Sequence, residues 1–303
     1  MAAESCARAP IVNAMTVDVE EHFQVSAFEG VIPRNQWKTL DSRVCANTER
    51  LLRIFGDYEI SATFFVLGCV AERLPQLVRR IASLGHEVAS HGYGHRLIYD
   101  QTPRTFRDDI RRAKAVIESA SGAPVLGYRA PSYSITPRSL WALDILIEEG
   151  YQYDTSIFPI HHDRYGIPVS PRHAYVIHRP AGVLVEAPAS TTAVGPLNLP
   201  IGGGGYFRIL PYSWTRWGIG RVNRLEHRPA IFYLHPWEID PDQPRFQAGF
   251  LSRFRHYRNL HRTEARLRRL LADFRFGPMK SVLSTAPVPE ATGQPALALP
   301  YQW

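Results

Sequence analysis

Hydrophobic positions along the chain follow two different periods, and their order predicts strands and helices in turn. Seven segments have the apolar, β-branched or alternating pattern of strands: residues 11–18, 61–68, 86–90, 125–131, 151–157, 183–188 and 231–236. Helices are expected between most of them, at residues 47–56 and 70–84, and in two segments that begin at Thr102-Pro103 and Thr136-Pro137 and end near Gly122 and Gly150. Strands that alternate with helices in this way indicate parallel βαβ units.

Polar side chains stand at or near the ends of five of these strands. They are Asp18, His91, Arg129, Asp154 and His235, residue types suited to acid–base and metal chemistry. In a barrel of parallel strands all carboxyl ends meet at one face, where catalytic groups gather. The sequence therefore predicts one site built from distant segments.

The rest of the chain is less regular. Residues 160–230 are rich in Pro and Gly, and we expect long loops over the same face. Residues 250–274 have helical spacing, with an apolar stripe and many arginines opposite it. The predicted organisation is a barrel over residues 1–240, an Arg-rich helical extension packed on it over 241–285, and a disordered tail over 286–303.

Composition narrows the class of protein. The 303 residues are 45% hydrophobic and 21% charged, as in ordinary globular proteins with a core. There is no apolar run of membrane-spanning or signal-peptide length, so we expect a cytoplasmic protein. The three scattered cysteines suggest reduced thiols. The net charge of +7 suggests an anionic partner, and no nucleic-acid-binding module is recognised, so nucleic acid is not expected.

The segment "ASHGYGHRL" places His91 and His95 four residues apart with two glycines between them. Two histidines at this spacing bind zinc on helices, but Gly92 and Gly94 would each destabilise a helix by about 1 kcal/mol. A tight loop fits better, because it lets both rings reach one point. Two unrelated histidines are the alternative, and a metal site open to substrate also requires a third ligand.

The first strand offers acidic candidates for this third ligand. Side chains of "TVDVEEHF" alternate, so Asp18 and Glu20 should share one face with Thr16, while Glu21 should face away and is the weaker candidate. One carboxylate could bind a metal while the other takes a proton from water. A solvated acidic turn is the simpler alternative.

Five short segments, in this order, resemble the motifs of the polysaccharide deacetylases with a NodB homology domain, carbohydrate esterase family 4. They are "TVDVE" from residue 16, "HGYGH" from 91, "RAPSY" from 129, "YDTS" from 153 and "YLHPW" from 233. The resemblance covers about residues 11–240. Val19 stands where a second Asp is usual, and Ser132 intervenes before Tyr133. The variants "VDVEEHFQV" and "FYLHPWEID" are similar to a subgroup associated with exosortase-type exopolysaccharide gene clusters.

This resemblance implies an α/β fold, a distorted (β/α)7-type barrel similar to a TIM barrel with a C-terminal helical extension. It implies a hydrolase of linear amide C–N bonds that removes N-acetyl groups from amino sugars. Glu20, His91 and His95 would bind a divalent metal, zinc or another such as cobalt or nickel. Asp18 would act as the base, and His235 would protonate the leaving nitrogen.

Two further residues have roles that stay open at this point. Arg129 would hold Asp18 ionised by charge pairing, or form a structural ion pair only. Asp154 would either orient His235 or cap a turn.

Substrate contacts are expected from the same motifs and their neighbours. The family motifs contribute Pro131, Tyr133 and Leu234, and Trp237 stands beside the catalytic histidine. In "IGGGGYFRILP", Gly204 would allow the backbone to approach a ligand, and Tyr206 could stack on a sugar ring, as could Phe207, Trp214 and Trp217 nearby. Packed aromatics under a loop are the alternative.

The expected partner is an N-acetylated polysaccharide or oligosaccharide, from an exopolysaccharide or its precursor. The arginines of residues 253–269 could contact an anionic glycan or a membrane surface, or form a solvated face. Two other functions stay open: a metal-independent hydrolase of cyclic amides and a non-catalytic glycan-binding protein. A glycosidase would use paired carboxylates but leaves the histidines unexplained.

Overall fold

The computed structural model describes residues 10–285 and 288–289 and contains one large, mostly parallel sheet. The strand order is β10-β1-β2-β3-β4-β5-β7-β6, and β11 also pairs with β1. Only the β6–β7 pair is antiparallel within this sheet. The strands are β1 (Val12–Val19), β2 (Thr63–Val66), β3 (Glu87–Ser90), β4 (Gly127–Tyr128), β5 (Tyr153–Asp154), β6 (Tyr175–Arg179), β7 (Gly182–Glu186), β10 (Ile231–Leu234) and β11 (Arg275–Gly277).

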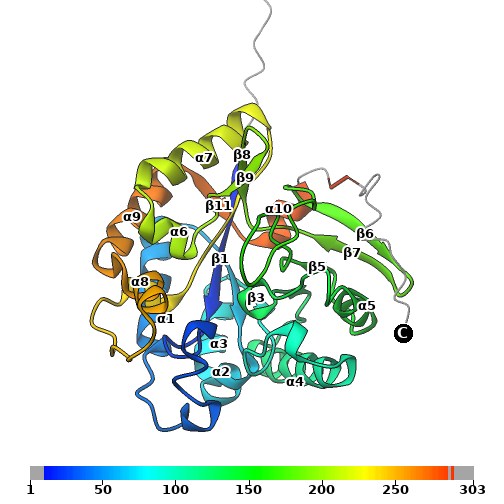
Figure 1. Ribbon diagram of the computed structural model, residues 1–303, viewed down its shortest axis with the longest axis vertical. Coiled ribbons are helices and arrows are strands. Elements are labelled where there is room, and N and C mark those ends of the chain that lie inside the picture. The colour runs from blue at the N-terminus through cyan, green and yellow to red at the C-terminus, as the bar shows by residue number, and fades with distance from the viewer. Residues whose placement is uncertain (1–9, 286–287, 290–303) are drawn as a thin grey trace, which may run out of the picture.

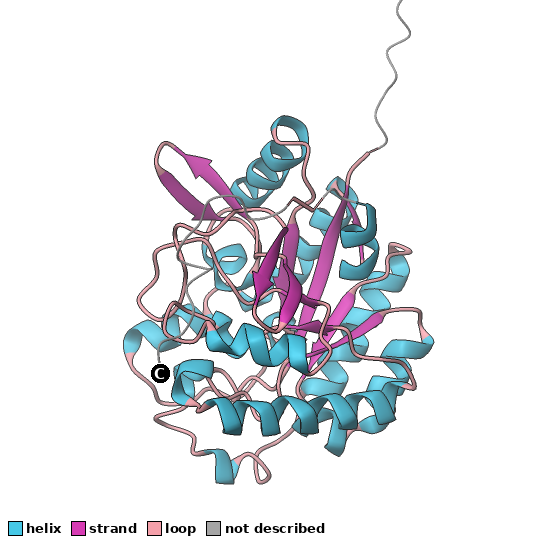
Figure 2. Ribbon diagram, turned by 90° about the vertical axis from the view of Figure 1, so that its right-hand side faces the viewer, coloured by secondary structure: helices cyan, strands magenta, loops and turns pink. Residues whose placement is uncertain are grey.

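Helices surround the strands in both views (Figures 1 and 2). They are α1 (Val44–Asp57), α2 (Gly68–Arg73), α3 (Pro75–Ser83), α4 (Pro103–Ser121), α5 (Trp141–Glu148), α6 (Gly204–Ile209), α7 (Tyr212–Leu225), α8 (Phe250–Tyr257), α9 (Leu260–Asp273) and α10 (Met279–Thr285). A separate hairpin consists of β8 (Thr191–Val194) and β9 (Leu197–Pro200). None of the helices among the described residues combines the length and the apolar character needed to cross a bilayer.

The two faces of the strands are buried against different partners. Val17 and Val19 belong to the large core between strands and helices, whereas Ala14, on the opposite face, belongs to a smaller inner cluster. Met279 and Val282 of α10 complete this inner cluster, and the Met279 N–H donates to Thr63 Oγ1 at the start of β2. Because α10 fills the amino end of the barrel interior, the polar residues at the carboxyl ends are left to form a cavity.

Loop segments bridge the gap between β7 and β10. The Ile231 N–H donates to Ser190 Oγ (2.6 Å), and the Tyr233 N–H donates to the Gly202 carbonyl (2.7 Å). A Cβ on Gly203, whose φ is +123°, would lie 1.9 Å from the Tyr233 carbonyl oxygen. These glycines therefore allow close backbone packing against β10. The arrangement is that of a distorted α/β barrel, as the sequence predicts.

Every predicted strand corresponds to an observed one, and the helix predicted after Thr102 is confirmed. Thr102 Oγ1 accepts from the Thr105 N–H in a capping box, and Gly122 ends α4 with φ +72°. A side-chain cap at one end and a left-handed glycine at the other satisfy the free backbone groups of the helix.

Four predictions about the remaining elements were wrong. Pro75, which lacks an N–H, divides the segment 70–84 into α2 and α3. Residues 136–139 form a turn, so that α5 begins only at Trp141. Residues 160–230 contain strands β6 to β9 and helices α6 and α7 rather than long loops only. Asn259, with φ +58°, separates α8 from α9. The predicted tail, apart from residues 288–289, lies outside the described residues.

Candidate metal and catalytic site

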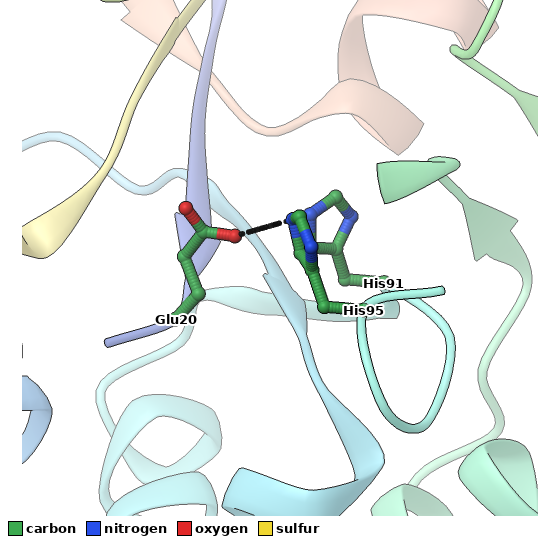
Figure 3. A group of neighbouring side chains, drawn as sticks. All are labelled: Glu20, His91 and His95. Atoms are coloured by element: carbon green, nitrogen blue, oxygen red, sulfur yellow. Dashed lines mark ion pairs between the residues drawn. The ribbon is translucent and has the colours of Figure 1, made fainter. Parts of the chain in front are cut away.

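Glu20, His91 and His95 form a buried group that could hold a metal ion. One ligand atom from each lies within 4.8 Å of the others. His95 Nε2 is 2.9 Å and His91 Nε2 is 3.8 Å from Glu20 Oε2. Figure 3 shows the Glu20 carboxylate, just after β1, facing the two imidazole rings on the loop after β3. Segments about 70 residues apart in sequence thus supply one set of ligands.

The loop that carries the two histidines is held by its backbone conformation and by two outside groups. Gly92 has φ +73° and His95 has φ +51°, so the chain turns sharply at both positions. Asp109 accepts from the Tyr93 N–H (2.7 Å), while the Arg34 guanidinium donates to the carbonyls of Gly94 and, at 2.9 Å, His95. The left-handed backbone at Gly92 explains why glycine follows the first histidine.

The hydrogen bonds around this group fit a divalent cation. Glu20 Oε2 is buried and accepts no hydrogen bond from any described residue, although His95 Nε2 lies close to it. His91 Nδ1 contacts the Arg129 carbonyl at 2.8 Å, which leaves Nε2 to face Glu20. Two imidazoles and one carboxylate are a common catalytic zinc ligand set, and a second hydrogen bond that fixes the ring is usual for ligating histidines.

Charges keep Glu20 in its ionised form. Burial raises its pKa, but the neighbouring His95 and His235 outweigh burial and hold the pKa well below its usual value. The indole N–H of Trp237 donates to Glu20 Oε1 at 3.2 Å. An ionised carboxylate with one oxygen that accepts no hydrogen bond is the form that binds a cation.

Glu21, the other carboxylate considered, has a different role. Its Oε2 accepts from the backbone N–H groups of Arg43 and Val44 at the start of α1, and its Oε1 accepts from Arg73 Nη2 at 2.6 Å. A carboxylate at a helix N-terminus is stabilised by the helix dipole. Glu21 therefore lies outside the cluster formed by Glu20 and the histidines.

Asp18 and Arg129 form a buried ion pair next to the group of Glu20, His91 and His95. Arg129 Nη1 donates to Asp18 Oδ1 (2.6 Å) and to Thr16 Oγ1 (2.8 Å), and Nη2 donates to Thr155 Oγ1 (3.3 Å). The guanidinium is fully buried, and its carbon lies 4.2 Å from the centroid of the Phe65 ring. Arg129 thereby fixes one oxygen of Asp18, while Asp18 Oδ2 faces His235 Nε2 at 3.8 Å.

His235 lies at the carboxyl end of β10 with acidic groups on both sides of its ring. Its Nε2 is 3.7 Å from Glu20 Oε1, and its Nδ1 is 2.7 Å from Glu238 Oε1. Burial lowers the pKa of His235, but the charges of Glu20 and Glu238 outweigh it and raise the pKa to about 9. A protonated imidazole here is suited to donate a proton into the cavity.

Sequence reasoning missed the residue that holds His235. Glu238 is fully buried, and Arg208, also buried, lies 3.6 Å from its second carboxylate oxygen. Glu238 follows His235 by three residues in "HPWE", in the 3-10 turn Pro236–Ile239. The spacing across that turn was the available signal, because residues three apart in a 3-10 turn lie on one side.

Asp154 does not contact His235 in the described structure. Its Oδ1 accepts from Ser156 Oγ (2.5 Å), and burial raises its pKa to about 6. Burial and the charge of Asp154 raise the pKa of the neighbouring Glu186 well above its usual value. Asp154 therefore belongs to a buried carboxyl pair behind the site, and the expectation that it orients His235 has no support from its contacts.

The predicted substrate contacts divide into two groups. A cavity of about 200 Å³ is lined by Asp18, Glu20, His91, His95 and His235 together with Tyr133 and Trp237, whereas Arg129 and Asp154 are not among its lining residues. Pro131, Leu234, Gly204 and Tyr206 are not among its lining residues. Leu234 faces the outer core, since it alternates with Tyr233 and His235 along β10, and a Cβ on Gly204 would contact the Tyr233 ring.

The other aromatics proposed for sugar stacking also lie elsewhere. Phe207 is buried in the outer core, and Trp214 and Trp217 line a separate surface pocket. The structure instead adds lining residues that the sequence did not indicate. They are Val25, Ser26, Ala27, Ala130, Ser132, His162, Arg164, Tyr165, Gly205, Arg208, Tyr233, Arg255 and His256. Ala130, Ser132 and Tyr233 lie within the motifs, whereas most of the others come from loops and helices elsewhere in the chain, where no local pattern marks them.

Two family models match this chain side by side. The polysaccharide deacetylase model matches residues 34–153, and a domain of unknown function (DUF3473) matches residues 155–284. His91 and His95 fall in the first match, and His235 with Glu238 falls in the second.

One similar protein is a peptidoglycan deacetylase of Helicobacter pylori, which is 31% identical over 114 residues. The aligned segment covers 38% of this chain and 37% of that protein. A chitooligosaccharide deacetylase of Bradyrhizobium is 30% identical over 99 residues, 33% of this chain and 43% of that protein. The chain thus matches less than half the length of these relatives. A crystal structure from Mycobacterium smegmatis, assigned to the polysaccharide deacetylases, aligns with a TM-score of 0.58 at 20% identity, over 95% of this chain and 99% of the other. At this identity the structural match shows a shared fold.

Proposed function

We propose, from the premise that this chain belongs to the polysaccharide deacetylase family, that it hydrolyses N-acetyl groups of amino sugars in a polysaccharide or its precursor. One observation carries the proposal. Glu20, His91 and His95 lie beside a buried carboxylate, Asp18, and an imidazole, His235, in one cavity. A metal-binding group, a base and an acid are the parts that amide hydrolysis requires.

Glu20, His91 and His95 would hold the metal, for which we propose zinc or another divalent ion such as cobalt or nickel. When bound, such an ion polarises a carbonyl and lowers the pKa of water. The free Glu20 Oε2 and the ring orientation imposed on His91 by the Arg129 carbonyl support this assignment.

Asp18 would take the proton from the attacking water. Arg129 donates to its Oδ1 and to Thr16 Oγ1, which leaves Asp18 Oδ2 toward the cavity and His235. Because the ion pair is buried and rigid, the carboxylate is positioned before substrate binds, which lowers the entropic cost of reaching the transition state.

His235 would deliver a proton to the departing nitrogen, because an amide anion is a poor leaving group. Its Nε2 lies within 4 Å of both Asp18 and Glu20, so the proton donor stands beside the proposed base and the proposed metal ligand, where water would attack the amide carbonyl. Glu238 at Nδ1 fixes the ring so that Nε2 carries the proton into the cavity.

The substrate class follows from the relatives and from the shape of the cavity. Relatives are named for peptidoglycan and chitooligosaccharides, both built from N-acetylated sugars. Tyr133 and Trp237 present aromatic rings in the cavity wall, as sugar sites do. We propose an N-acetylated exopolysaccharide or its precursor as the substrate, with the arginines of residues 253–269 available to contact an anionic glycan or a membrane surface.

The test is acetate release from N-acetylglucosamine oligomers by the full chain, before and after chelation and after re-addition of zinc, cobalt or nickel. We expect release that is lost with the metal, restored by at least one ion, and lost in Asp18→Asn. Activity that survives complete metal removal would reject the proposed mechanism. Oligosaccharide binding without any acetate release, under all metal conditions, would indicate a glycan-binding protein instead.

A further inference from the structure

Helix α8 exposes an apolar surface that no described residue covers. Phe250 is 80% exposed, Leu251 65% and Phe254 39%, and Phe250 is the most exposed large hydrophobic residue in the described part of the chain. The rings of Phe250 and Phe254 stack with centroids 6.4 Å apart. Adjoining exposed side chains of this kind usually mark a contact site for a partner or a membrane. We call Phe250, Leu251 and Phe254 the α8 surface.

The segment around the α8 surface is strongly basic. Residues 243–263 contain Arg245, Arg253, Arg255, Arg258 and Arg262 and no Asp or Glu. The Arg258 guanidinium lies 5.7 Å from the centroid of the Phe254 ring, so a positive charge borders the apolar side chains directly. Apolar residues beside arginines are the pattern of helices that lie in the interface of an anionic bilayer.

The α8 surface is fixed in position beside the catalytic cavity. Arg255 and His256 of this helix line the cavity. The buried Arg208 donates to the carbonyls of Arg255, His256 and Arg258 and thereby anchors the end of the helix. Arg208 also lies 3.6 Å from Glu238, the residue that holds His235. The same guanidinium therefore contacts both helix α8 and the partner of His235.

We propose that α8 docks the protein on the surface of an anionic lipid bilayer, with Phe250 and Leu251 inserted and the arginines at the headgroups. This inference rests on the proposed function in one respect, since it places the active-site cavity at the membrane surface, where a lipid-linked glycan would be presented.

Two other occupants fit the α8 surface less well. A second copy docked through a two-fold axis would bring the same five arginines against each other, with no carboxylate in the segment to offset them. An anionic glycan would account for the arginines but not for Leu251, an exposed aliphatic side chain next to Phe250.

The experiment is co-sedimentation of the full chain with vesicles of phosphatidylcholine alone or mixed with phosphatidylglycerol. We expect binding to the mixed vesicles that weakens at high salt. The double variant Phe250→Ser/Leu251→Ser should weaken it by about tenfold or more, because the inserted hydrocarbon is lost. Leu225→Ser is the matched control, since Leu225 is also 65% exposed but lies at the end of α7, and it should bind as the original chain does.

Several results would overturn this proposal. They are equal binding to neutral and mixed vesicles, unchanged binding by the double variant, or a dimer in light scattering that the double variant dissociates. Binding that needs Arg253 and Arg258 but not Phe250 and Leu251 would indicate an anionic ligand without insertion, which also contradicts it.

Acetate release from soluble oligomers should stay unchanged in the double variant. Vesicle binding without acetate release by the original chain would reject the proposed function and leave the docking surface standing.

Discussion

The two parts of the chain on either side of residue 154 differ in regularity and in what they contribute to the site. Residues 12–154 follow a strand–helix repeat and provide Asp18, Glu20, His91, His95 and Arg129. Residues 155–285 contain two hairpins, five α-helices, the 3-10 turn Pro236–Ile239 and two strands that join β1, and they provide His235 and Glu238. The two family models divide the chain at nearly the same point.

This difference separates two chemical tasks. The first part holds the groups that would bind a metal and activate water, and the side chains of all of them are buried. The second part holds the group that would protonate the leaving nitrogen and much of the cavity wall. Variants in the two parts should therefore fail in different ways.

The largest effect is expected for His91→Ala in the first part. Removing one of three ligands should lower metal content and acetate release together, by roughly 10³-fold or more in activity, since a Lewis acid contributes several kcal/mol. Metal analysis of the purified chain and acetate release measure the two. The exposed His261→Ala is the control and should change neither. A His91→Ala chain that keeps its metal and its full activity would show that His91 is not a metal ligand.

His235→Ala should impair protonation of the leaving nitrogen while leaving metal binding intact. We expect kcat to fall by about 10²–10⁴, as for loss of a general acid, with metal content unchanged. The measurement is kcat on oligomers alongside metal stoichiometry. An activity within tenfold of the original would contradict the acid role. Equal loss of metal would mean that the two tasks are not separable at this residue.

Glu238→Gln should have a smaller effect on the protonation of the leaving nitrogen by His235. The imidazole keeps its place but loses the charged partner at Nδ1, so we expect kcat to fall by about tenfold to a hundredfold with little change in KM. Asp154→Asn is the matched control, because Asp154 was the sequence-based candidate for this role. If Asp154→Asn lowers kcat more than Glu238→Gln, the assignment of Glu238 is wrong.

The smallest effect concerns the buried Asp154–Glu186 pair at the border between the two parts. Both carboxyls have raised pKa values in the folded chain, Asp154 at about 6, so the folded state binds protons more tightly than the unfolded state. Stability should therefore be highest below the unfolded pKa values and fall as the pH rises through the folded ones.

Glu186→Gln should reduce this fall between pH 4 and pH 7 by about 1–2 kcal/mol, because a neutral amide has no ionisation to suppress. Urea unfolding at several pH values measures the free energy of unfolding in both chains. A parallel dependence on pH in the two chains would show that the pair does not govern it.

The first part was the more predictable because its signals are local. The alternation in "TVDVEEHF" placed Asp18 and Glu20 on one face, and the Thr102-Pro103 start and Gly122 end defined α4. The second part was harder because its helices and hairpins depend on contacts with β10 and β1. Gly204, for example, was expected to let the backbone approach a ligand, yet it lies against the ring of Tyr233 in β10.

The sequence by itself determined the α/β order of the elements, the polar strand ends and the spacing of His91 and His95, because each depends on a repeat or turn within a few residues. Only the tertiary structure decided that Glu238 rather than Asp154 faces His235, and that Glu21 accepts hydrogen bonds from the start of α1. It also decided that α8 leaves Phe250 and Leu251 uncovered beside the cavity. Those outcomes depend on which side chains from distant parts of the chain come into contact once the strands are ordered and packed. A pattern of neighbouring residues does not specify these contacts.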